Sequence, residues 1–332
     1  MERVKMIQVG CGYVAQAEHI PAHLLNRDVE LVAVVDSQIE VAKDIGEKFR
    51  VKWFGDMEEC LSTVECDAVD ISTPEFTHFD LAMKAIQASK HVLIEKPLAV
   101  NCKEGEEIIA AARQKGLKLM VAYMRRYDSD CVYVKQLIEK GDLGPVRAAL
   151  GLFKLAYKGH FIRLSEGPKP STKGGGVPSI PHSAAGSDKI SRQLIHQINL
   201  LRYWLGEVKD VVTVKTGQNV INLMLEFNSG ALGSLSHLNG MGNGEEVWVF
   251  GDEGNAHVRL WSPHLPYEFP RLEVFHRSKQ LRSEVIIPRE NPFTAEIAYF
   301  AKCILKNEEP RSPGEDALKD LELIEKIHNF NK

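Results

Sequence analysis

Apolar and polar positions in the first third of the chain alternate between short strand-like runs and longer helix-like stretches. The predicted strands are Val4–Val9, Leu31–Asp36, Ala68–Ser72, His91–Ile94 and Leu117–Ala122. The predicted helices are Ala15–Asn26, Ile39–Phe49, Thr77–Ala88 and Lys103–Lys115. Near-continuous apolar strands are buried on both faces, and strands that alternate with helices form parallel sheets. Right-handed crossovers then predict a doubly wound α/β Rossmann domain over residues 1–122.

The pattern changes near Tyr123, where we place a domain boundary. After a predicted helix at Ser129–Lys140, apolar residues recur at every second position, which is typical of strands with one buried face. Asn228-Ser229-Gly230 favours a hairpin. Residues 123–332 are therefore expected to form an α+β domain for substrate binding and oligomerisation, built on a large, mainly antiparallel open sheet. Its predicted strands are Arg147–Ala156, Val208–Thr216, Val220–Phe227, Ala231–His237, Glu246–Phe250, His257–Leu260, Arg271–His276 and Arg282–Ile287. Its closing helices are Pro292–Lys306 and Gly314–Asn329.

One segment between these elements has no regular pattern. Residues Lys158–Ser187 are rich in Gly, Pro, Ser and Lys, and they include Gly174-Gly175-Gly176. Long unpatterned loops in compact proteins are usually either functional or mobile. The segment is therefore interpreted either as a loop near the substrate mouth or as a surface loop without order.

Composition narrows the class of protein. A length of 332 residues exceeds one ordinary core, and 44% hydrophobic with 26% charged residues is typical of globular proteins. The formal charge of −4 offers no basic field to a nucleic acid. No apolar run reaches the roughly 18–20 residues that span a bilayer, and the strand that starts at Val4 leaves no room for a signal peptide. We expect a cytoplasmic protein that binds neither membranes nor nucleic acids.

The six cysteines are scattered along the chain without a Cys-x-x-Cys pair. Neither a disulfide framework nor a zinc site is predicted from this spacing. His19 and His23 are four residues apart, as metal ligands on a helix often are, but no third ligand accompanies them. We expect them to pack the first helix and expect no metal.

A glycine-rich turn follows the first predicted strand. Gly10-Cys11-Gly12-Tyr13-Val14-Ala15 matches the pattern G-x-G-x-x-G/A. Gly10 permits the tight turn, Gly12 lets the backbone approach a pyrophosphate, and Ala15 is small enough for the helix to pack closely on the strand. The pyrophosphate is expected at the helix N-terminus, where free N–H groups and the helix dipole favour anions.

The second predicted strand ends in an acidic residue, Asp36. A carboxylate at this point accepts hydrogen bonds from the adenosine ribose and repels a 2′-phosphate. No arginine follows at Ser37 or Gln38, so NAD is expected rather than NADP. Asp36 could instead cap the following helix, and this alternative stays open.

Glu95-Lys96-Pro97, at the end of the fourth predicted strand, is the most diagnostic tripeptide of the chain. It ends the run Ala85-x-x-ASKHVLIEKP, and it is accompanied by Thr73-Pro74 with His78 and by Arg192–Asn199 before Trp204-Leu205-Gly206. On these residues the chain resembles the Gfo/Idh/MocA family, the glucose–fructose oxidoreductase and inositol dehydrogenase-like proteins. The resemblance covers nearly the whole chain.

This resemblance implies hydride transfer between nicotinamide C4 and a hydroxyl-bearing carbon of a sugar, an inositol or a sugar derivative. It implies that Lys96 lies by the nicotinamide and the substrate, and that His196 of the second domain faces it. It also implies a homodimer or homotetramer formed through the second sheet. The cofactor-binding residues predicted from the motifs and the resemblance are Gly10, Gly12, Tyr13, Val14, Ala15, Asp36, Ser37, Thr73, Pro74, His78, Glu95 and Lys96. Substrate-binding residues are predicted at Arg126, Tyr157, Arg192 and Asn199.

The chemistry of the reaction agrees with these residue types. Oxidation of an alcohol needs a base for the hydroxyl proton, and a base works best when its pKa lies near the working pH. A lysine meets this requirement when it is desolvated or lies near another cation, whereas a histidine titrates there without help. Lys96 ends a parallel strand, at the edge where doubly wound sheets bind ligands. Pro97 is expected to shape the turn through a cis Lys96–Pro97 bond.

The predicted helix Ser191–Leu205 has one apolar stripe and one polar stripe. The polar stripe contains Arg192, His196, Asn199 and Tyr203, and it is either a solvated face or part of the active site. Many family members carry acids where this chain has Arg192 and Asn199. Which of Lys96 and His196 accepts the hydroxyl proton therefore stays open. Arg192 has two possible roles. It binds a carboxylate or phosphate of the substrate, or it forms an ion pair with a nearby acidic residue of the protein.

Three functions fit the sequence. The first is a dehydrogenase or reductase that acts on a hydroxyl of a sugar, an inositol or a sugar derivative. The second is an enzyme in which NAD stays bound and is recycled, without net oxidation. The third is a regulator that binds the dinucleotide as a signal. The presence of Lys96 and His196 favours catalysis over sensing.

Overall fold

The computed structural model of the protein describes residues 3–155, 187–241, 244–260, 270–288 and 290–330, with only the backbone at 155 and 187–193. These residues form two compact units. The first contains residues 3–124 and 291–321, and the second contains the described residues of 125–290 together with 322–330. The predicted loop Lys158–Ser187 lies almost entirely outside the described residues, and so does Tyr157.

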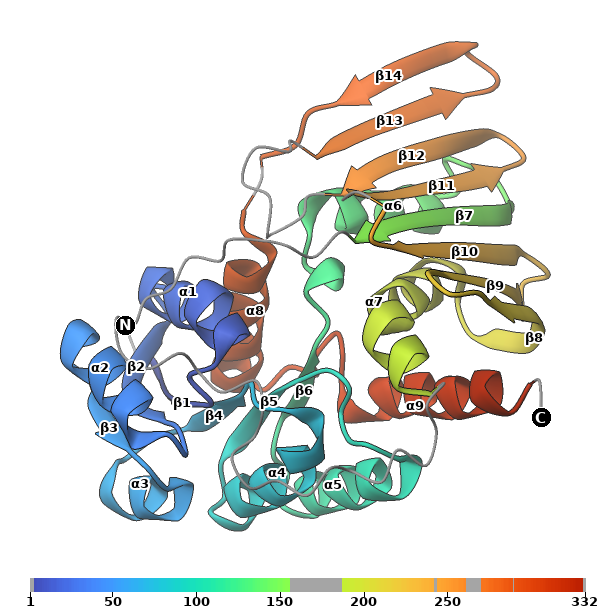
Figure 1. Ribbon diagram of the computed structural model, residues 1–332. Coiled ribbons are helices and arrows are strands. Elements are labelled where there is room, and N and C mark those ends of the chain that lie inside the picture. Colours follow the sequence, from blue (N-terminus) through green and yellow to red (C-terminus); the bar gives the residue numbers. More distant parts are fainter. Residues whose placement is uncertain (1–2, 156–186, 242–243, 261–269, 289, 331–332) are drawn as a thin grey trace. The chain divides into compact units, whose positions relative to one another are not determined.

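The first unit is built on a six-stranded sheet in which every neighbouring pair is parallel (Figure 1). The strand order is β3-β2-β1-β4-β5-β6, so the order reverses between β1 and β4. Both β4 and β6 are buried along their whole length, as a sheet covered on two faces requires. The Rossmann prediction is confirmed. The strands are β1 Val4–Val9, β2 Val29–Val35, β3 Lys52–Phe54, β4 Ala68–Ile71, β5 His91–Glu95 and β6 Leu119–Ala122.

Helices cover both faces of this sheet. Figure 1 shows α4 and α5 side by side on one face, and α1 with α8, which pack against each other, on the opposite face. The caps are those that the sequence favours, because the Asn291 side chain accepts from the N–H groups of Phe293 and Thr294 and Pro292 occupies the first turn. The helices are α1 Ile20–Leu25, α2 Ile39–Phe49, α3 Met57–Thr63, α4 His78–Gln87, α5 Cys102–Gln114, α8 Pro292–Lys306 and the start of α9 Gly314–Asn329.

Three details of this unit differ from the prediction. Helix α8 and the start of α9 belong to it, although they were predicted to lie in the second domain. The strand β3 and the helix α3 were not predicted, because they span only three and seven residues and elements this short give little periodic signal. The predicted helix Ala15–Asn26 is a π-helical turn, Ala15–His19, followed by α1. Pro21 lies in the first turn of α1 and has no N–H to donate, which explains the break in regular α-helical bonding.

The second unit contains an eight-stranded sheet of order β14-β13-β12-β11-β7-β10-β9-β8. β7 and β10 are parallel neighbours, and all other neighbouring pairs are antiparallel, which confirms the prediction of a mainly antiparallel sheet. The strands are β7 Val146–Leu155, β8 Val208–Thr216, β9 Val220–Phe227, β10 Leu232–Asn239, β11 Gly244–Gly251, β12 Gly254–Leu260, β13 Arg271–His276 and β14 Leu281–Val285.

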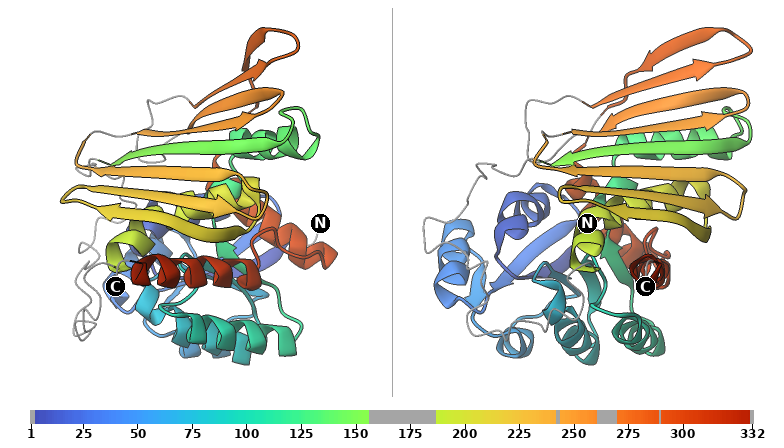
Figure 2. Two further views of the ribbon diagram at one scale, coloured as in Figure 1. Left: turned by 90° about the vertical axis from the view of Figure 1, so that its right-hand side faces the viewer. Right: turned by 45° about the vertical axis from the view of Figure 1, so that its right-hand side comes forward.

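Two helices, α6 (Ser129–Glu139) and α7 (Ser187–Leu205), pack on one face of this sheet (Figure 2). Their apolar residues join the inward-facing strand residues in one continuous core, in which Trp204 and Phe227 are among the largest side chains. The indole N–H of Trp204 donates to the carbonyl of Cys131 at 3.0 Å, which ties α7 to α6. The core therefore fixes the helix that carries His196.

Candidate active site

The glycine turn after β1 has the backbone that a pyrophosphate site requires. Gly10 has a φ of 86°, and its N–H donates to the carbonyl of Val35 at 2.8 Å. A Cβ at Gly10 would lie 2.6 Å from the Ser72 carbonyl oxygen, so any larger residue there would force the backbone of the turn to shift. A Cβ at Gly12 would meet nothing within 4 Å. The space next to the Gly12 backbone is therefore open to a ligand.

Asp36 secures this turn from the end of β2. One carboxylate oxygen accepts from the N–H of Cys11 at 2.8 Å, and the other accepts from the N–H of Gln38 at 2.8 Å. Gln38, and not Asp36, is the N-cap residue of α2. A carboxylate has about four acceptor positions, so Asp36 keeps acceptor capacity for ribose hydroxyls.

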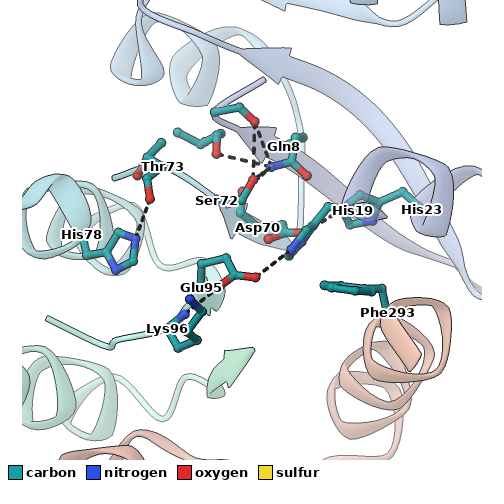
Figure 3. A network of polar contacts seen from close by, with 12 residues as sticks. Gln8, His19, His23, Asp70, Ser72, Thr73, His78, Glu95, Lys96 and Phe293 are labelled. Carbon is teal, nitrogen blue, oxygen red and sulfur yellow. Dashed lines mark hydrogen bonds and ion pairs between the residues drawn. The ribbon is translucent and has the colours of Figure 1, made fainter. Parts of the chain in front are cut away.

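Gln8 is a further polar residue of this site, and sequence reasoning missed it. Its fully buried side chain donates to the Ser72 hydroxyl at 2.6 Å and to the Gly10 carbonyl at 3.1 Å (Figure 3). It therefore joins the end of β1 to the end of β4. A glutamine inside a strand predicted to be buried was the signal for this role, because buried amides need partners.

The predicted cofactor-binding residues lie at the carboxyl ends of β1, β2, β4 and β5, along one edge of the parallel sheet. His78 is buried beneath this edge, with its ring nitrogens 2.7 Å from the Pro97 carbonyl oxygen and 2.9 Å from that of Thr73. Burial lowers the pKa of His78. A neutral ring carries one N–H, so it donates to only one of these two carbonyls, which belong to the segments after β4 and β5. Of the other predicted residues, Ala15 is buried, Tyr13 and Thr73 are half-buried, and Val14, Ser37 and Pro74 are exposed.

Lys96 follows β5 directly and is half-buried. The Lys96–Pro97 peptide bond is cis, as predicted. The Lys96 backbone N–H donates to a carboxylate oxygen of Glu95 at 3.0 Å. The Glu95 carboxylate thus holds the backbone of Lys96 in place.

Glu95 belongs to a buried polar network under this edge, shown in Figure 3. His19 Nε2 lies 3.1 Å from Glu95 Oε1, and His19 Nδ1 lies 2.9 Å from Asp70 Oδ2. His23 Nε2 lies 2.8 Å from the same Asp70 oxygen. The four-residue spacing of His19 and His23 therefore lets both rings contact the same Asp70 oxygen. Within the described residues no group of three or more His, Cys, Asp or Glu side chains could hold a metal ion.

The charges of the network follow from its contacts. Burial alone would disfavour a charged imidazole, but the carboxylates of Asp70 and Glu95 raise the pKa of His19 well above its ordinary value. Burial would likewise raise the pKa of both carboxyls, but the attraction and hydrogen bonds of His19 lower it. Glu296 of α8 is fully buried, and burial together with repulsion by Glu95 raises its pKa well above the usual range. Burial and this repulsion therefore favour the protonated form of Glu296.

Glu18 is a second carboxyl with a raised pKa, and it gives a prediction for the stability of the protein. Burial raises the pKa of Glu18 to about 7, against a weaker lowering by the hydrogen bond from Asn291. Between about pH 5 and 7 the folded chain holds a proton that the unfolded chain has released, so native stability falls as the pH rises. Glu18→Gln keeps the acceptor for Asn291 and should stabilise the protein by up to about 3 kcal/mol at pH 8 and by little at pH 4. Urea denaturation at both pH values measures this, and an equal change at both would show ordinary ionisation of Glu18.

In the second unit, two of the predicted substrate residues contact each other. Arg126 is buried and donates through Nε to the side-chain oxygen of Asn199 at 2.7 Å, and its guanidinium lies 5.3 Å from the centre of the Tyr203 ring. Asn199 is 1% exposed, so this part of the polar stripe on α7 is not a solvated face. His196 is half-buried on the same helix, and the structure describes only the backbone at Arg192.

None of the helices in the described part of the chain is both long and apolar enough to cross a membrane.

Two family models match this sequence. The model described as "Oxidoreductase family, NAD-binding Rossmann fold" matches residues 4–123, and the one described as "Oxidoreductase family, C-terminal alpha/beta domain" matches residues 184–329. Together the two matches cover most of the chain.

Two curated relatives and one solved structure match most or all of the chain. The dTDP-3,4-didehydro-2,6-dideoxy-alpha-D-glucose 3-reductase of Actinomadura kijaniata is 24% identical over 329 residues, which is 96% of this chain and 93% of the relative. The scyllo-inositol 2-dehydrogenase (NAD(+)) of Bacillus subtilis (strain 168) is 26% identical over 301 residues, 86% of this chain and 80% of the relative. The crystal structure of an aldose–aldose oxidoreductase from Caulobacter crescentus, complexed with glycerol, has a TM-score of 0.82 at 24% identity and covers 100% of this chain and 99% of that one. This last similarity shows a shared fold.

Proposed function

The chain belongs to the Gfo/Idh/MocA family of NAD(P)-dependent oxidoreductases, and we propose that it transfers hydride between the nicotinamide ring and a hydroxyl-bearing carbon of a sugar, an inositol or a sugar derivative. The curated relatives are a sugar 3-reductase and an inositol dehydrogenase, which supports this class of substrate.

One observation supports the proposal above all others. The open glycine turn follows β1 and Lys96 follows β5, and β4 is the single strand between them in the sheet. Ligands of doubly wound sheets bind at the carboxyl edge where the strand order reverses, which here lies between β1 and β4. A dinucleotide with its adenosine half toward Asp36 would extend its nicotinamide half toward Lys96.

Lys96 and His196 are the proposed proton-handling residues. In the oxidising direction one of them accepts the hydroxyl proton as hydride leaves the carbon, and in the reducing direction it returns that proton. Arg126, Tyr157, Arg192 and Asn199 are the proposed substrate-binding residues. The hydrogen bond from Arg126 to Asn199 supports a common role for these two. An arginine at position 192 suggests a carboxylate or phosphate on the substrate.

NAD is the proposed cofactor. Asp36 lies at the end of β2, where its charge would repel a 2′-phosphate, and its two backbone contacts hold it there. Neither of the next two residues, Ser37 and Gln38, supplies a cation to bind that phosphate.

An absorbance assay tests this function. The purified protein is incubated with NAD or NADP and a panel that pairs neutral polyols with sugar acids and sugar phosphates, and formation of reduced cofactor is followed. We expect at least one substrate of the panel to reduce NAD in preference to NADP. We also expect anionic substrates to be preferred over neutral ones, and this preference to weaken in Arg192→Ala. Bound cofactor that turns over without net change would instead indicate internal recycling. Inertness of wild type and Lys96→Ala alike, with dinucleotide bound, would indicate a sensor.

We also propose that the protein is a homo-oligomer that associates through the outer face of its eight-stranded sheet. This face exposes Leu150, Leu232 and Phe250, each at 37–44% of its surface, on three neighbouring strands, and exposed apolar side chains that lie together favour association. Sedimentation at a monomer mass would contradict this proposal.

A further inference from the structure

The buried network beneath Lys96 contains a histidine whose two ring nitrogens both face carboxylates. Nδ1 of His19 lies 2.9 Å from Asp70 and Nε2 lies 3.1 Å from Glu95, and the side chain has no exposed surface. A neutral imidazole carries one N–H and could donate to only one of these partners. The ring satisfies both carboxylates only when both nitrogens are protonated. The geometry therefore favours a buried imidazolium.

Each structural element packed around His19 contributes to its charge environment. Carboxylates face it from β4 (Asp70) and β5 (Glu95), and the buried Glu296 and the ring of Phe293 approach from α8. Glu18, the preceding residue, has a pKa of about 7, raised by burial, and His23 shares the Asp70 oxygen. Two buried carboxylates are thus offset by one buried cation, which makes the charge on His19 the central element of the network.

Glu95 links this cation to Lys96. One Glu95 oxygen binds His19, and the other accepts the backbone N–H of Lys96 at 3.0 Å. The positive charge of Lys96 also lowers the pKa of Glu95, in addition to the hydrogen bond from His19. Any change in the charge or position of Glu95 therefore changes the surroundings of Lys96.

We propose that His19 is a positioning residue for the proposed reaction: its imidazolium holds Glu95 against the Lys96 backbone and offsets the Glu95 charge, so that the Lys96 amine can release its proton. This inference rests on the proposed role of Lys96 as a proton-handling residue. It assigns to His19 a part in the chemistry that the sequence pattern did not indicate.

His19→Gln removes the cation and keeps one donor in a side chain of similar reach. Without the imidazolium the negative charge of Glu95 is no longer offset, so the acidic limb of the pH profile of kcat/KM should move up by about one pH unit. At pH 7 kcat/KM should fall about tenfold, and the Kd for NADH should change by less than about threefold.

His23→Gln is the matched control. His23 is equally buried and bonds the same Asp70 oxygen, and its hydrogen bonds within the described chain do not include Glu95. A general loss of packing or of the Asp70 contact affects both variants alike. The expected result is a shifted pH profile in His19→Gln alone, and identical profiles in the two variants would overturn the proposal.

A measurement without substrate separates this inference from the proposed function. The pH dependence of Lys96 labelling by trinitrobenzenesulfonate, read from its peptide by mass spectrometry, reports deprotonation of the amine directly. A midpoint that is higher in His19→Gln than in wild type supports the proposal even if no alcohol is oxidised, and equal midpoints refute it. If His19→Gln does not fold, ¹⁵N NMR of the wild-type ring decides, since a His19 ring with one proton at pH 7 would overturn the proposal.

Discussion

Lys96→Met should lower kcat by about 10²–10⁴-fold, the usual contribution of a positioned proton donor or acceptor. The methionine fills a similar volume at the half-buried position after β5 but offers no group that can take a proton from the substrate. The backbone contact from residue 96 to Glu95 is retained, because it uses the main-chain N–H. We therefore expect the Kd for NADH, measured by fluorescence titration, to stay within about tenfold of the wild-type value.

Lys118→Met serves as the control for this prediction. Lys118 is a largely buried lysine directly before β6 of the same sheet, where its amine contacts Glu309 at 2.7 Å. It lies at the amino end of its strand, opposite the edge that carries the proposed site. Its replacement should change stability and leave kcat unaltered. A Lys96→Met enzyme with wild-type kcat would show that the base is another residue, with His196 as the first candidate.

The elements of the fold were largely predictable from the sequence because their patterns are local. The helix Ile39–Phe49 and the strand Val220–Phe227 were predicted to the residue, the first from its apolar face and the second from strict alternation. The bounds of helix α8 were also predicted to the residue, and in the structure its start is fixed locally by the Asn291 cap and Pro292. The short strand β3 was missed because its pairing with β2 depends on tertiary contact and leaves no periodic signal.

The proposed site was predictable to the extent that its residues lie at the ends of strands. Parallel strands bring the glycine turn, Asp36 and Lys96 to one edge, whatever the details of packing. The network under that edge was not predictable, because it joins His19 to Asp70 and Glu95 across distant parts of the sequence. Asp70 inside an apolar strand was the available signal, since a buried carboxylate requires partners. The sequence alone could not name them.

Gly12→Ala should abolish tight cofactor binding without harming the fold. The new methyl group meets nothing within 4 Å in the protein, so the free energy of unfolding should change by less than about 0.5 kcal/mol. The same methyl group would occupy the space through which a pyrophosphate approaches the backbone. We expect the Kd for NADH to rise by at least about tenfold, a loss of about 1.4 kcal/mol of binding free energy.

Gly10→Ala is the contrasting variant, because it should act on the fold itself. Its Cβ would lie 2.6 Å from the Ser72 carbonyl oxygen and 2.7 Å from Thr73 Cγ2, at a φ of 86° that L side chains rarely adopt. Backbone strain and overpacking each cost about 1–3 kcal/mol, so urea denaturation should show a clear loss of stability. The two neighbouring glycines thus separate two roles of one turn, since Gly10 makes its shape possible and Gly12 leaves room for the ligand. A Gly12→Ala protein that binds NADH like wild type would place the dinucleotide elsewhere and remove the basis for a hydride acceptor beside Lys96.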